Sequence, residues 1–144
     1  MELRSSTEVV LLVAGLIFLW ALALGVVKYK QMATSENHLA HPYVDTAHRA
    51  ALLYSFATLL IAAFVELSSW SETVNMVAAG VLMFFFVGVI AAYAFLGIRG
   101  GTTNQFADPY PNAFSVHAWM FLLILGEIGA FGVLLAGFVD ARFV

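Results

Sequence analysis

The chain has 144 residues, of which 62% are hydrophobic and only 10% are charged, whereas about a quarter of the residues in soluble domains are charged. This composition excludes an ordinary soluble domain and indicates an integral membrane protein. The absence of cysteine excludes disulfides, thiolate ligands and iron–sulfur clusters. With a net charge of -3 and no stripe of basic residues, we expect no nucleic-acid partner.

Four stretches are apolar over about the 20 residues that a helix needs to cross a bilayer. They are residues 9–27, 47–67, 74–97 and 113–139. We therefore predict an all-α fold, a four-transmembrane-helix bundle, with residues 1–144 forming a single membrane domain. The first stretch lacks an A-x-A-like cleavage site and is long enough to span, so we expect it to remain as a helix.

The connections between these stretches differ in length. The first and third are long and polar, and the second, ELSSWSET, is a short turn that makes its two flanking stretches antiparallel neighbours. Both long loops therefore lie on one side of the membrane, here called side B, opposite the N-terminal side A. Since long loops usually carry function, we expect the functional site at side B.

The basic residues are divided unequally between the two sides. Four are placed on side B and two on side A, namely Lys28, Lys30, Arg49 and Arg99 against Arg4 and Arg142. The positive-inside bias then predicts that side B faces the cytoplasm.

Two histidines stand at helix ends near side B. His48 opens the second stretch and His117 lies near the start of the fourth, both at about the depth of Tyr93. A single histidine at an interface is more often hydrogen-bonded or solvated than a ligand, although His is the commonest metal-binding side chain. Because two histidines lie at one depth in a chain without cysteine, we consider a metal or haem centre as a hypothesis. His38 and His41 lack a third ligand and are interpreted as solvated.

Glu127 and Tyr93 each allow two interpretations. An intramembrane carboxylate is expensive in lipid, so Glu127 is either functional or a bonded link between helices that the small residues of GEIGAFGVLLAG bring close together. Tyr93 either anchors its helix at headgroup depth or turns its hydroxyl toward a ligand. The face Phe86, Val89, Tyr93 and Gly97 would form an apolar wall with one polar group, which is typical of small-molecule sites.

Several motifs occur in a familiar order. AHRAALL opens the second stretch, Tyr93 stands late in the third, and IRGG and NQF precede the fourth. On a four-span chain of this length, this order resembles the styrene oxide isomerases, small bacterial membrane enzymes that bind haem b (heme b). The resemblance covers most of the chain. It departs at Tyr54, where the family has an asparagine, and at His117, which is an addition.

The resemblance implies a role for each of these residues. His48 would be the axial ligand of the haem iron, and Tyr93 would orient the epoxide or stabilise its opening. Tyr54 and Asn104 are further catalytic candidates, and His117 is a second candidate for cofactor binding. The family also implies a homotrimer with haem near the protomer boundaries, in the inner membrane of a bacterial cell.

The reaction implied is the conversion of an apolar aryl epoxide, such as styrene oxide, to a carbonyl compound by Lewis-acid ring opening and a 1,2-hydride shift. Two other functions stay open. If His48 and His117 ligate one iron, the chain is a bis-histidine b-type cytochrome that transfers electrons. Alternatively, it is a cofactor-free accessory subunit of a larger membrane complex.

Overall fold

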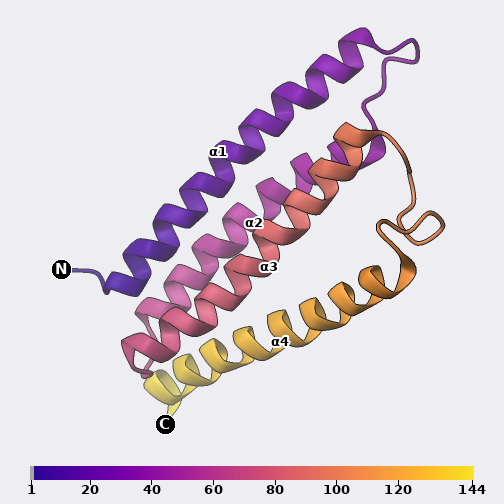
Figure 1. Cartoon of the computed structure of the whole chain (residues 1–144). Helices are drawn as coiled ribbons and strands as arrows, with labels where there is room; N and C mark the ends of the chain where they lie inside the picture. Colours follow the sequence, from indigo (N-terminus) through magenta and orange to yellow (C-terminus); the bar gives the residue numbers. More distant parts are fainter. Residues whose placement is uncertain (1) are drawn as a thin grey trace.

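The structure, a computed structural model, describes residues 2–144, and every regular element within them is a helix (Figure 1). The helices are α1 (Ser5–Thr34), α2 (Pro42–Glu66), α3 (Glu72–Arg99) and α4 (Ala113–Phe143). Each is long and apolar enough to cross a membrane. The predicted all-α four-helix bundle is therefore confirmed, as expected for a multi-pass membrane protein.

The helices extend beyond the apolar stretches that predicted them. α1 continues to Thr34 and α2 begins at Pro42, so the first long loop shrinks to residues 35–41. Helix ends follow capping as well as hydrophobicity. A proline in the first turn needs no backbone donor, and the His41 side chain accepts a hydrogen bond from the Tyr43 backbone N–H at 3.2 Å.

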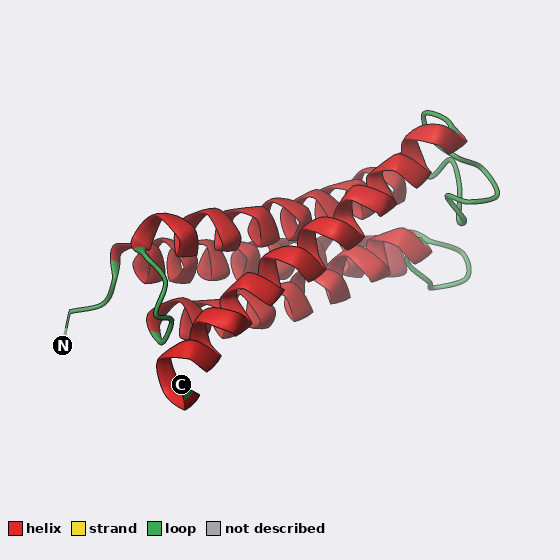
Figure 2. Cartoon of the chain, turned by 90° about the horizontal axis from the view of Figure 1, so that it is seen from below, coloured by secondary structure: helices red, strands yellow, loops and turns green. Residues whose placement is uncertain are grey.

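Two carboxylates fix the start of α1 at side A. Glu66 accepts hydrogen bonds from the Arg4 backbone N–H at 3.1 Å and from the Thr7 hydroxyl at 2.6 Å. Glu72 accepts one from the Ser6 backbone N–H. The first N–H groups of a helix have no partner within the helix, and negative charge suits that end of its dipole. These bonds tie α1 to the α2–α3 turn at the end of the bundle where both termini lie (Figure 2).

Helices α1, α2 and α3 pack around two apolar clusters. The cluster toward side B contains many small residues, which let helices approach closely in a membrane. Its buried members are Ile17, Ala21, Leu24, Ala47, Ala51, Ile90 and Ala94. Both long loops lie at this end of the bundle (Figure 2), as the topology predicted.

α4 is attached more loosely than the other helices. At side A its Gly137 carbonyl accepts from the Ser69 backbone N–H at 3.0 Å, and its Val133 carbonyl accepts from the Trp70 indole at 2.7 Å. Toward side B it diverges from α3 (Figure 1), and it makes no contact with α1. Its only buried residues are Leu134 and Gly137. Most of its surface therefore faces lipid or another chain.

The close approach of α2 and α3 at side B depends on Gly97. A methyl group at this position would lie 2.6 Å from the backbone nitrogen of Val44. We expect Gly97→Ala to push the helices apart and to lower the free energy of unfolding by about 1–3 kcal/mol, the usual cost of overpacking. The midpoint of thermal unfolding in detergent measures this effect.

Gly80 on the same helix provides a matched control. Nothing lies within 4 Å of a methyl group added there, so Gly80→Ala should stabilise the chain by about 0.5–1 kcal/mol through helix propensity alone. Equal unfolding midpoints for the two variants would contradict the close packing at Gly97.

Candidate functional site

His48 is half-buried on α2 and faces α1. Its Nδ1 lies 2.9 Å from the backbone carbonyl oxygen of Ala21. Because a carbonyl oxygen only accepts hydrogen bonds, Nδ1 must carry the proton, and the Nε2 lone pair is left free. Metal-binding histidines are commonly fixed by this bond from the second ring nitrogen to a backbone carbonyl.

Gly25 of α1 makes room for the imidazole. A methyl group at Gly25 would lie 3.1 Å from Cε1 of His48, so a larger residue would press on the ring. Within the described residues, no group of three or more His, Cys, Asp or Glu side chains gathers around a common point. His48 thus presents one ring nitrogen without a partner among these residues.

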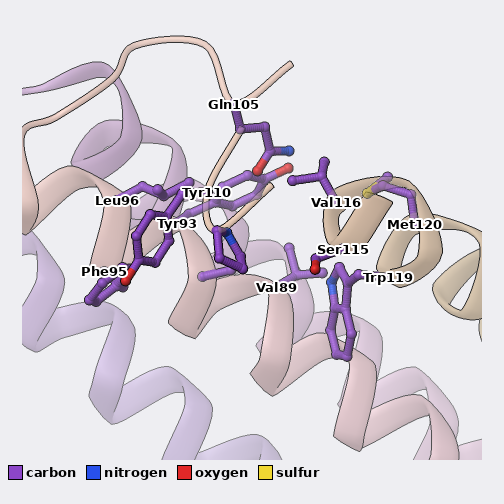
Figure 3. A pocket seen from close by; sticks show the side chains of 12 residues that line it. Val89, Tyr93, Phe95, Leu96, Gln105, Tyr110, Ser115, Val116, Trp119 and Met120 are labelled. Atoms are coloured by element: carbon purple, nitrogen blue, oxygen red, sulfur yellow. The ribbon is translucent and has the colours of Figure 1, made fainter. Parts of the chain in front are cut away.

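A cavity of about 270 Å³ lies between α3, the α3–α4 loop and the beginning of α4 (Figure 3). Its lining is mainly apolar, and Tyr93, Gln105, Tyr110 and Ser115 are polar residues in it. Tyr93 stacks on Tyr43 of α2, with ring centroids 5.6 Å apart and planes inclined by 14°. This stack holds the Tyr93 ring at the cavity wall, and its hydroxyl has no hydrogen bond to any of residues 2–144. An apolar chamber with few polar groups is the usual form of a small-molecule site.

The α3–α4 loop is tied over this cavity by two contacts. The Gln105 backbone N–H donates to the Tyr43 hydroxyl at 2.7 Å. The Arg99 guanidinium lies 4.0 Å from the centroid of the Tyr110 ring, a cation–π contact. The loop is thus fastened to α2 through Tyr43 and to the end of α3 through Arg99.

Trp119 of α4 lines the cavity on the side that faces α3 (Figure 3). Its ring centroid lies 5.4 Å from that of Phe85 and 6.0 Å from that of Phe84. These aromatic rings fill the space between α3 and α4 where the two helices begin to diverge.

Tyr54 lies on the α3-facing side of α2. Its ring stacks on Phe86 with centroids 4.2 Å apart. It stands six residues after His48, which at about 100° per residue places the two side chains about 120° apart around the helix. Within one chain, the structure therefore directs His48 toward α1, while Tyr54 and Tyr93 pack at the α2–α3 contact.

The other two predicted site residues lie at the surface. His117 is exposed on α4, with its ring centroid 6.0 Å from that of Phe106. The His48 ring instead meets α1, which α4 does not contact, so a single chain does not bring the two imidazoles together. Asn104 is exposed, and its Oδ1 accepts from the Phe106 backbone N–H at 3.0 Å. Asn104 therefore shapes the loop that covers the cavity.

Sequence reasoning did not identify Tyr43 or Trp119 as site residues. Tyr43 could have been found, because it lies eleven residues before Tyr54, about three helical turns, and so shares its face. Trp119 gives no such signal, since an aromatic residue does not stand out in an apolar helix.

Comparisons with known proteins leave the family open. No protein-family model, curated protein or solved structure matches the chain.

Removing the hydroxyl of Tyr43 should loosen the loop over the cavity. In Tyr43→Phe the ring can still stack on Tyr93, but the Gln105 amide loses its acceptor, and such a bond contributes about 0.5–1.5 kcal/mol. We expect hydrogen exchange at the Gln105 amide to become up to about tenfold faster, because the loop opens more often. Tyr29→Phe, at an exposed position of α1, is the control and should leave exchange at the Gln105 amide unchanged. Unchanged exchange in Tyr43→Phe as well would show that the Tyr43–Gln105 hydrogen bond does not hold the loop.

Proposed function

We propose that this protein is a haem b-dependent isomerase of the styrene oxide isomerase type, which converts an apolar aryl epoxide to a carbonyl compound. The observation that carries the proposal is the His48 imidazole, fixed through Nδ1 by Ala21 with Nε2 free to bind iron. A mainly apolar cavity with Tyr93 in its wall supports it.

The residues present fit a haem group that would be held through one histidine. His48 would hold the iron, and Gly25 leaves the space that the imidazole needs. When bound, haem iron supplies a Lewis acid for the epoxide oxygen. The chain supplies position, a polar group and the exclusion of water.

Tyr93 is suited to assist the opening of the epoxide ring. Its hydroxyl has no hydrogen bond in the structure, so it can donate to an oxygen on which negative charge develops. The apolar side chains that line the cavity exclude water, which would otherwise trap the ring-opened substrate as a diol. Phe95 and Tyr110, each about half exposed at the cavity, leave an approach for a substrate that is dissolved in lipid.

The arrangement favours an oligomer in which one copy completes the site of the next. His48 lies at the contact of α1 and α2, whereas the Tyr93 cavity opens between α3 and α4. A head-to-tail contact between these two different faces would bring them together, and such contacts form rings when the rotation between copies closes. This reasoning agrees with the homotrimer implied by the resemblance, which also suggests the inner membrane of a bacterial cell.

The competing functions receive less support from the geometry. A bis-histidine cytochrome within one chain requires His48 and His117 to meet, but the His48 ring is bonded to α1, a helix that α4 with His117 does not contact. A cofactor-free accessory subunit leaves the free Nε2 of His48 without a purpose. A visible spectrum of the purified protein distinguishes the three, since the subunit would be colourless and a bis-histidine iron would not take up an added ligand.

His48→Ala should remove the haem. We expect the purified variant to lose most of its visible absorbance, because the imidazole is the proposed iron ligand. His117→Ala is the matched control and should retain the cofactor. Full haem content in His48→Ala, with helical content unchanged by circular dichroism, would show that the ligand assignment is wrong.

Tyr93→Phe should retain the haem spectrum and slow the reaction. Styrene oxide is supplied to membranes that contain the protein, and formation of the aldehyde is followed. Loss of one donor to a developing oxyanion commonly reduces turnover by about 10²–10³-fold, and we expect a decrease approaching that range. Tyr29→Phe should have no effect. An unchanged rate in Tyr93→Phe would assign Tyr93 an anchoring role only.

A further inference from the structure

A second cavity, of about 470 Å³, lies between the middle parts of α2, α3 and α4. We refer to it as the Glu127 groove, because Glu127 is its only charged lining residue; the remainder are Ala57, Leu60, Ile61, Leu82, Phe86, Ile128, Phe131, Gly132 and Leu135. Ile128 is 71% exposed and Leu60 is 53% exposed. Because both stand near the middle of membrane-spanning helices, the groove opens to the hydrocarbon of the bilayer.

One oxygen of the Glu127 carboxyl is left unsatisfied by residues 2–144. This oxygen, Oε1, is enclosed and has no hydrogen-bond partner among the described residues. The six basic side chains offer no partner at this depth, since each stands toward the end of a helix or just outside one. Glu127 itself lies near the middle of α4. A carboxylate placed this way in lipid is costly, and such residues generally pair with a cation or a donor.

We propose that the Glu127 groove binds a lipophilic amine, a molecule with one cationic head and an apolar body, that enters from the bilayer. Charge complementarity identifies the head, because an ammonium group offsets the carboxylate where the low dielectric strengthens their attraction. The apolar lining accepts the body, and the volume falls within the range of ligand sites. This site is separate from the Tyr93 cavity and does not depend on the isomerase proposal.

The test uses the full chain in nanodiscs and two fluorescent probes. One is a dansyl group on a pentyl chain with a free terminal amine, and the other carries a hydroxyl in place of the amine. We expect wild type to bind the amine about tenfold more tightly than the alcohol, a difference of about 1.4 kcal/mol. In Glu127→Gln, which keeps the shape and removes the charge, this preference should fall to twofold or less.

Two glycines of α4 supply matched steric variants. Nothing lies within 4 Å of a methyl group added at Gly132 or at Gly129, but only Gly132 lines the groove. Gly132→Leu should therefore fill the groove and abolish saturable binding of both probes, whereas Gly129→Leu should bind them as wild type does. Neither substitution is expected to unfold α4, since leucine favours a helix more than glycine does.

Three results would overturn the proposal. The first is equal affinity for the two probes in wild type, which would remove the role of the charge. The second is undiminished binding in Gly132→Leu, which would place the probes elsewhere. The third combines two observations: the wild type binds no amine, and Gly132→Leu changes the oligomeric state in native mass spectrometry. Together they would show that a second copy of the chain fills the groove.

Discussion

The attachment of α4 at side A is the constraint on which both cavities depend. The Gly137 and Val133 carbonyls accept hydrogen bonds from the α2–α3 turn, so this end of α4 cannot move away from the bundle. At side B the helix is held by aromatic contacts and by a loop, and it diverges from α3 (Figure 1). In lipid, an apolar side chain gains little free energy by moving from the hydrocarbon into the space between helices. The divergence of α4 from α3 therefore costs much less free energy than it would in water.

The polar groups of the bundle fall into two kinds. Thr7, Glu66 and Glu72 bond to the backbone or to one another at side A, where they join helices. His48 and Glu127 instead retain atoms that the structure leaves without partners. In a membrane, where unpaired polar atoms are expensive, the second kind is where ligands are to be sought.

The sequence predicted much of the fold and less of the site. The four helices could be predicted because each contains about 20 apolar residues, and the shared side of the two long loops follows from the number of crossings. The helix ends could not be predicted in this way. Residues 28–34 of α1, for example, lie beyond the apolar stretch, and their helical conformation depends on capping and local contacts. His48 and Tyr54 were predicted as members of one site, although their spacing already placed them on different faces of α2. The position of Trp119 depends on how α4 inclines, which an apolar sequence does not reveal.

The length of α4 has a physical consequence. A helix of 31 residues measures about 46 Å, against a hydrocarbon core of about 30 Å, and such hydrophobic mismatch is commonly accommodated by tilting. Since one end of α4 is anchored, a change of tilt moves mainly the other end, where the Tyr93 cavity lies. The width of that cavity is thereby coupled to bilayer thickness. Lipids with shorter or longer acyl chains change the tilt of α4 and so change the shape of the cavity.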